Sequence, residues 1–158
     1  MSEDQFGFDI EFDDKTQAIL DWIAPEAMES GVRGFLADTV PGIADYDTDS
    51  WWQPPLSTHV FDAARRLFGN YAGFRASENQ TAAEQFVRFL GECCIRRHPG
   101  MSWTNNDIGD ALFDGFRPAV YDADSGKGCG LMRIARALFT ADDAEQVEYE
   151  LRAVGRPA

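Results

Sequence analysis

The sequence predicts an α+β fold in which several helices pack on a short antiparallel sheet. Beyond residue 50, four segments repeat apolar side chains at the spacing of an amphipathic helix, and two short apolar runs beside Gly, Pro and Asn are typical of strands. The helical segments are residues 57–68, 81–98, 131–139 and 140–154, and the strands are residues 101–105 and 116–121. A chain of 158 residues can bury one hydrophobic core without disulfides or metal. We therefore expect a single domain over residues 1–158, with a flexible acidic N-terminal arm over residues 1–13.

The first forty residues combine an alternating segment with a helix. Between residues 6 and 12 every second residue is Phe or Ile, which fits a half-buried strand, an ordered arm or a docking segment. A helix is then predicted over residues 14–30. We expect Pro25 to interrupt this helix, and Gly31 and Gly34 to end it.

Negative charge is concentrated at the start of the chain. Residues 1–50 hold thirteen of the 27 Asp and Glu side chains but two of the fourteen Lys and Arg, a net charge of −11 out of −13. Such a field repels nucleic acid and anionic lipid, and it favours encounter with a basic partner. The alternative is that the charge serves solubility alone.

An acidic loop begins with Asp45, Asp47 and Asp49, the alternating carboxylates that open a calcium-binding loop. The calcium pattern then fails, because Ser50 replaces the glycine of the sixth position and Leu56 replaces the bidentate glutamate of the twelfth. We therefore expect no metal here.

Trp51 and Trp52 follow these carboxylates directly. Together they suggest a protein-recognition loop, in which the aromatic side chains anchor a partner and the acids select it. The alternative is that one tryptophan completes the core while the other lies on the surface.

Caps and turns delimit the predicted helices. Ser57 and Thr140 are expected to cap two of them, and Thr81 with Glu84 forms a capping-box pattern at the start of a third. The apolar face of this third helix consists of Phe86, Val87, Leu90 and Cys94. The helix ends at residues 98–100, His-Pro-Gly, and a strand around Trp103 follows.

Two residues in this third helix invite a structural explanation. Gly91 inside a helix costs about 1 kcal/mol relative to alanine, so another element is expected to pack closely on it. Glu92 lies off the apolar face, and we expect it to bond a neighbouring strand or turn. No paired acid or base accompanies it for catalysis.

Cysteine and histidine positions do not predict a metal site. Cys94 and His98 are four residues apart, and Cys129 or His59 could complete a set of ligands. Structural zinc prefers paired short spacings, and buried helical cysteines usually act as small hydrophobic residues. We expect reduced thiols, including Cys93, and no cysteine nucleophile.

A glycine-rich segment lies between a predicted strand, which should be at an edge or begin at Pro118, and a predicted helix. Gly126, Gly128 and Gly130 could place backbone N–H groups around a phosphate, although the segment matches neither the nucleotide nor the dinucleotide glycine motif. Residues 118–130 resemble the strand, loop and helix that bind the coenzyme A pyrophosphate in a large family of N-acetyltransferases. This resemblance implies coenzyme-A-dependent acetyl transfer, and the alternative is a plain turn.

A longer resemblance spans about residues 82–121. This stretch is similar to uncharacterised bacterial, often actinobacterial, small α+β domains in which a helix ends in a Gly-Glu pair and a tryptophan strand and a proline strand follow. The resemblance is carried by Phe89, Leu90, Gly91, Glu92, Gly100, Trp103 and Pro118. It implies an immunity-like or accessory protein.

From these features we expect a cytoplasmic, non-enzymatic binding protein, immunity-like or regulatory, that engages a basic protein and needs no cofactor. The acidic N-terminus differs from a signal peptide, and no run of residues is apolar for long enough to span a membrane. We expect no direct binding of nucleic acid. Two alternatives remain: the coenzyme-A-dependent acetyltransferase, and an acidic mimic of DNA.

Overall fold

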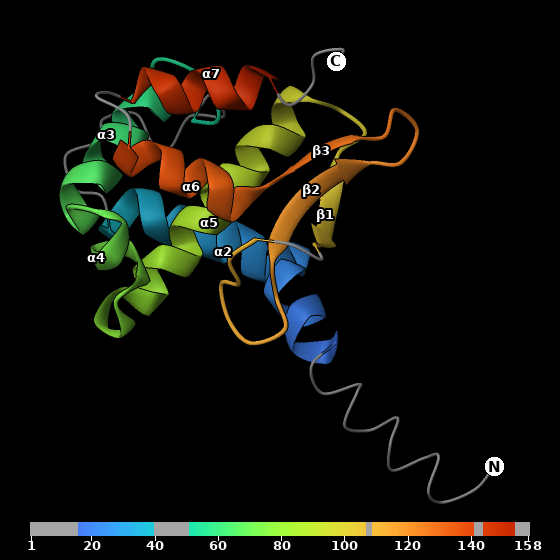
Figure 1. Cartoon of the computed structure of the whole chain (residues 1–158), viewed down its shortest axis with the longest axis horizontal. Coiled ribbons are helices and arrows are strands. Elements are labelled where there is room, and N and C mark those ends of the chain that lie inside the picture. The colour runs from blue at the N-terminus through green and yellow to red at the C-terminus, as the bar shows by residue number, and fades with distance from the viewer. Residues whose placement is uncertain (1–15, 40–50, 107–108, 141–143, 154–158) are drawn as a thin grey trace, which may run out of the picture.

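The structure, a computed structural model, describes residues 16–39, 51–106, 109–140 and 144–153. Within these residues, helices pack on a three-stranded antiparallel sheet, which confirms the predicted α+β class (Figure 1). The arm predicted over residues 1–13 lies outside the described part of the chain.

The first helix breaks where the sequence predicts. Residues 16–23 are helical, Ala24 interrupts them, and α2 (Pro25–Gly34) continues into one π-helical turn, η1 (Phe35–Thr39). Pro25 begins α2, where its missing N–H would have no helical partner in any case.

Gly31 does not end this helix, contrary to the prediction, whereas Gly34 is the last residue of α2, after which the chain continues as the π-helical turn η1. A Cβ atom on Gly31 would lie 2.7 Å from Cδ of Arg88, and one on Gly34 would lie 3.2 Å from Nε2 of Gln85. Both glycines therefore allow close packing of α2 on the central helix, α5 (Gln80–Arg97), and do not act as C-terminal caps.

Two of the predicted caps are also wrong. In α3 (Leu56–Phe68) the N-cap position is occupied by Pro55, while Ser57 is buried and donates to a distant glutamate. In α5 the first residue is Gln80, and Glu84 accepts a hydrogen bond from Nε1 of Trp22 at 2.8 Å. These polar side chains join separate elements, and so are not free to cap their own helix.

Between α3 and α5 lie two short helices, α4 (Tyr71–Arg75) and η2 (Ser77–Asn79). The turn into α4 follows Gly69, which has a φ of +79° that glycine adopts without strain. Asn70 then caps α4, since its side chain accepts a hydrogen bond from the backbone N–H of Gly73 at 2.7 Å.

The sheet is an antiparallel meander of β1 (Ser102–Asn105), β2 (Pro118–Asp122) and β3 (Lys127–Gly130), in the order β1-β2-β3. The two predicted strands are confirmed, and the second begins at its proline as expected. Most of the glycine-rich segment forms the third strand, and the predicted turn is limited to its start. Gly126 alone makes the hairpin turn, with a φ of +74°.

Two helices complete the chain, α6 (Leu131–Thr140) and α7 (Glu145–Ala153). The prediction of α6 is confirmed. Thr140 does not cap α7 as expected: it ends α6, and its hydroxyl donates to the carbonyl of Ala137.

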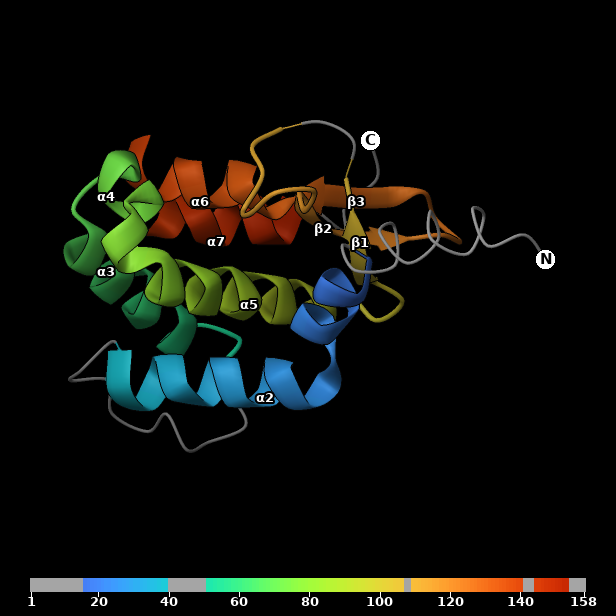
Figure 2. The same ribbon diagram turned by 90° about the horizontal axis from the view of Figure 1, so that it is seen from below.

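The helices stack in layers around α5. Figure 2 shows α2 on one side of α5 and α6 with α7 on the other, with the sheet at one end of the stack. Because both sides of α5 are covered, Phe89 and Cys93 are buried together with the predicted apolar face. Neighbouring rings in this core have centroids 5.3 to 6.5 Å apart. They belong to Phe35, Phe61, Phe68, Phe74, Phe86 and Phe89.

Gly91 and Glu92 join α5 to the sheet. A Cβ atom on Gly91 would lie 2.1 Å from the indole of Trp103, and Nε1 of that indole donates to Oε2 of Glu92 at 3.0 Å. Both expectations for these residues are confirmed: a strand side chain packs on the glycine and bonds the glutamate. The pair therefore has a structural role, which is to dock β1 on α5.

Candidate functional site

The predicted recognition loop is only partly described. The carboxylates of residues 45–49 lie outside the described residues. Trp51 is 3% exposed, its ring lies 5.6 Å from that of Phe89, and the guanidinium of Arg96 covers it at 4.8 Å. Trp51 therefore belongs to the core and does not fit the predicted role of partner anchor. Trp52 is half-buried, as expected if the pair divides between core and surface.

Exposed carboxylates mark the described part of the acidic N-terminal third. Asp21, Glu26, Glu29 and Asp38 are all exposed. Only Glu29 has an ion pair among the described residues, with Arg33 at 3.0 Å. We call these four residues the acidic face. Glu26 and Glu29 belong to α2, Asp38 to η1 and Asp21 to the helix before α2. The helix α2 itself lies on the side of α5 away from α6 and α7 (Figure 2).

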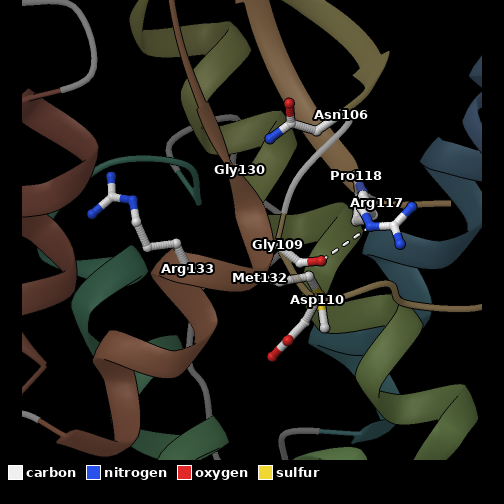
Figure 3. Close-up of a pocket in the computed structure, with 8 residues that line it drawn as sticks. All are labelled: Asn106, Gly109, Asp110, Arg117, Pro118, Gly130, Met132 and Arg133. Atoms are coloured by element: carbon white, nitrogen blue, oxygen red, sulfur yellow. Dashed lines mark hydrogen bonds between the residues drawn. The ribbon is translucent and has the colours of Figure 1, made fainter.

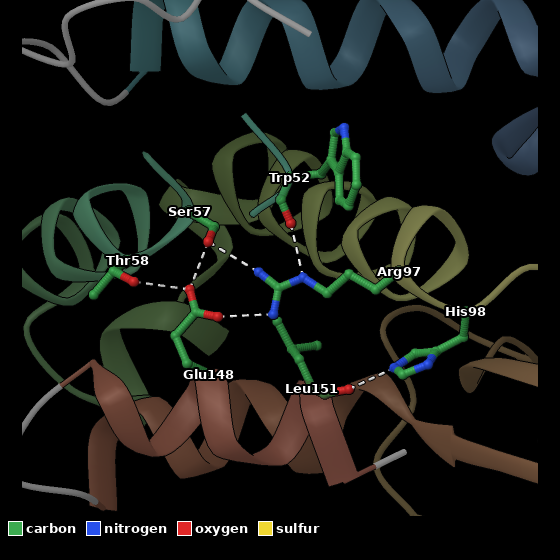
Figure 4. Close-up of polar contacts among 7 residues, drawn as sticks. All are labelled: Trp52, Ser57, Thr58, Arg97, His98, Glu148 and Leu151. Carbon is green, nitrogen blue, oxygen red and sulfur yellow. Dashed lines mark hydrogen bonds and ion pairs between the residues drawn. The ribbon is translucent and has the colours of Figure 1, made fainter. Parts of the chain in front are cut away.

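A buried ion pair links three helices on the opposite side of α5. Arg97 donates to Oε2 of Glu148 at 2.7 Å, and it also donates to the Ser57 hydroxyl at 2.9 Å and the Trp52 carbonyl at 2.8 Å (Figure 4). The other carboxylate oxygen of Glu148 accepts from Ser57 and from Thr58. The side chains of Arg97 and Glu148 are 9% and 3% exposed. These contacts hold the start of α3, the end of α5 and α7 together.

Sequence reasoning missed this network, although α7 contains a signal for it. Glu148 lies at helical spacing among Ala144, Val147 and Leu151, which are buried. A glutamate on a buried helix face requires a partner, because an unpaired buried charge is strongly destabilising. The signal indicates that a partner exists, but only the structure identifies it as Arg97.

A pocket of about 570 Å³ lies beside this network. Four basic side chains line it, Arg96, Arg97, His98 and Arg152, and none of its other lining residues in the described part of the chain is acidic. Trp52, Gln53 and two prolines also line it. We call this cavity the basic pocket. It is a local exception in a chain with a net charge of −13.

A smaller hollow of about 230 Å³ lies where β3 passes into α6 (Figure 3). It contains two arginines that already have partners. Arg117 donates to the carbonyl of Gly109 at 3.0 Å, and Arg133 pairs with Glu150 at 3.0 Å. The charge of this hollow is therefore partly compensated by the protein itself.

The three predicted cofactor-binding glycines line a shallow hollow on the sheet of about 250 Å³. Gly126 forms the hairpin turn, while Gly128 and Gly130 belong to β3. A Cβ atom on Gly128 would lie 2.4 Å from the carbonyl oxygen of Val120, so this glycine permits the pairing of β2 with β3. Strand packing thus accounts for a glycine that the sequence associates with phosphate.

The cysteines remain thiols, and two of them interact across elements. Burial raises the pKa of Cys93. A hydrogen bond between the thiols of Cys94 and Cys129 raises the pKa of Cys94 and lowers that of Cys129. In the described part of the chain, no group of three or more His, Cys, Asp or Glu residues could hold a metal ion.

Comparison with protein families, curated proteins and solved structures finds no match to this chain. Of the helices in the described ranges, none is both long and apolar enough to cross a lipid bilayer. The described part of the molecule is an α+β fold with an acidic face in its N-terminal third and a basic pocket at the C-terminal end of α5.

Proposed function

We propose that this protein is a non-enzymatic binding protein whose acidic N-terminal third engages a basic surface on a protein partner. The observation that carries this proposal is the charge asymmetry. Residues 1–50 have a net charge of −11 while the remainder has −2, and the described acids of that first part are exposed.

The acidic face also offers an apolar contact. Leu20 is 50% exposed next to Asp21, on the helix that precedes α2. Interfaces commonly combine an apolar anchor with charged residues around it, and complementary charge raises the rate of association. A partner with a basic rim around an apolar patch would match this surface.

An immunity-like or regulatory role is consistent with such binding. In that role the protein would cover a basic functional surface of its partner, and it would need neither cofactor nor catalytic residue. Mimicry of DNA is a special case of the same electrostatics, in which the covered surface normally binds nucleic acid.

The test uses the purified products of the neighbouring genes, each mixed with the full-length protein at low and at high salt. One variant combines Asp21→Asn, Glu26→Gln and Asp38→Asn, and a second changes Asp45, Asp47 and Asp49 to Asn. A matched control, Asp62→Asn with Glu78→Gln and Asp124→Asn, removes three exposed charges elsewhere. We expect loss of complex formation in the first two variants and at high salt, with binding retained in the control.

Complex formation that is indifferent to salt and to both acidic variants would contradict the proposal. Competition by duplex DNA for the same partner would support the DNA-mimic form. A thermal shift caused by coenzyme A would instead support the acetyltransferase alternative.

A further inference from the structure

The basic pocket carries positive charge that no ion pair among the described residues neutralises. Arg97 is neutralised by Glu148, which lies 2.7 Å away. Arg96 and Arg152 are exposed and form no ion pair with any described residue. Their two positive charges therefore face a cavity of about 570 Å³ whose lining, among the described residues, includes no carboxylate.

The walls of this pocket are held in position by buried contacts. The guanidinium of Arg97 donates to the carbonyl of Trp52 and so fixes the chain segment that forms one wall. His98, on the facing side, bonds the carbonyl of Leu151 through Nε2 at 2.8 Å. The side chain of Arg96 rests on the buried ring of Trp51. A pocket whose walls are already ordered loses little entropy when a ligand binds.

The wall is apolar as well as basic. Trp52 and Pro54 line the pocket next to the arginines, and the indole of Trp52 is half-buried. Ligand sites commonly combine such apolar and aromatic walls with a few charged groups that set orientation, in cavities of about 300–1,000 Å³. Arginine binds carboxylate and phosphate groups through paired N–H donors.

We propose that the basic pocket binds a small organic anion, in which a flat aromatic ring system carries a carboxylate or a phosphate. The ring would pack on Trp52 and Pro54, and the anionic group would bind Arg152 and Arg96. This site is separate from the acidic face, and the inference does not depend on the proposed protein partner.

The experiment measures binding by two-dimensional NMR of the full-length protein with two pairs of probes. Indole-3-acetate is compared with the neutral indole-3-ethanol, and adenosine 5′-monophosphate with adenosine. We expect shifts at residues of the basic pocket, with affinity at least about tenfold higher for the anionic member of a pair. The pair that shows the larger preference identifies carboxylate or phosphate as the anionic group.

Three variants separate binding from folding. Arg152→Gln, and separately Arg96→Gln, should abolish the preference for the anion, whereas Arg66→Gln, which removes an exposed charge on α3, should leave it unchanged. The proposal is overturned if neither anion binds better than its neutral counterpart. It is also overturned if both pocket variants lower thermal stability without changing affinity. The arginines would then only stabilise α5 and α7, through the helix dipole at their C-terminal ends. Binding that requires an acidic peptide in place of these small anions would likewise overturn it.

Discussion

Charge is exposed on the acidic face but buried in the ion pair of Arg97 and Glu148, which lies beside the basic pocket. On the acidic face, carboxylates are exposed and a single ion pair, Glu29 with Arg33, joins two partly exposed side chains. In the buried ion pair, Arg97 and Glu148 are nearly excluded from water. Arg97 donates to the Ser57 hydroxyl, and Glu148 accepts from Ser57 and Thr58. Exposed charge can be replaced at small cost in stability, whereas buried charge is part of the fold.

This difference is tested most severely by Glu148→Ala. The change leaves the guanidinium of Arg97 buried without its carboxylate, and we expect a loss of about 3–5 kcal/mol in the free energy of unfolding. Urea denaturation followed by circular dichroism measures it. Glu150→Ala is the matched control, because Glu150 pairs with an Arg133 side chain that is 60% exposed, and it should lose no more than about 1 kcal/mol.

A double variant, Arg97→Met with Glu148→Leu, removes both charges together. Replacing a buried ion pair with apolar residues of similar volume is often neutral or stabilising. We therefore expect it to recover most of the stability lost in Glu148→Ala. If the single and the double variant lose the same free energy of unfolding, the packing around Arg97 and Glu148 depends on side-chain shape and not on charge pairing.

The two faces of α5 can be compared through glycines. Gly91→Ala would place Cβ 2.1 Å from the rigid indole of Trp103, so we expect a net loss of about 2 kcal/mol, even though alanine favours the helix. Gly31→Ala, on α2, would place Cβ 2.7 Å from Cδ of Arg88, a longer side chain that can shift more easily than the indole, so we expect a smaller loss than for Gly91→Ala. Thermal melting of both variants checks this, and similar melting temperatures would contradict it.

Two serines, one in the buried network and one on α2, should show a smaller difference in stability when each is replaced with alanine. Ser57→Ala removes one hydrogen bond from Glu148 and one from Arg97, with an expected loss of about 1.5 kcal/mol. Ser30→Ala, at an exposed position of α2, should have almost no effect. If calorimetry shows equal changes, the hydroxyl of Ser57 does not stabilise the ion pair.

The smallest effect is expected where charge is exposed in both regions. The triple change Asp21→Asn, Glu26→Gln and Asp38→Asn, and separately Arg152→Gln, should each alter the free energy of unfolding by less than about 1 kcal/mol. Chemical denaturation measures this directly. A larger loss would mean that these charges contribute to the stability of the fold.

Local sequence patterns predicted the elements that depend on neighbouring residues. Pro25 interrupts a helix because its ring and missing N–H act within one turn, and β2 begins at Pro118 for the same reason. Gly91 indicated a close contact because glycine in a helix is unfavourable by itself. The strand β3 was missed because its glycines suggest a turn, whereas pairing with β2 requires the absence of a side chain at Gly128.

The acidic face follows from composition, whereas the basic pocket depends on tertiary contacts. Composition alone located the excess of negative charge, and the described carboxylates in that part of the chain are exposed. The sequence singles out the pair Trp51 and Trp52, but only the structure shows where each lies. Trp51 packs in the core against Phe89 and Arg96, and Arg97 holds the backbone of Trp52 beside the pocket. No local signal places Arg152 beside Arg96.

By itself, the sequence determined the fold class, the helix break at Pro25, two of the three strands and the asymmetry of charge, because periodicity, backbone restriction and composition are local properties. Only the tertiary structure decided which polar side chains meet. Ser57 and Glu148 are separated by 91 residues and still share a hydrogen bond in the core. Their contact, and the pocket beside it, follow from the packing of α3, α5 and α7, in which each buried polar group must find a partner.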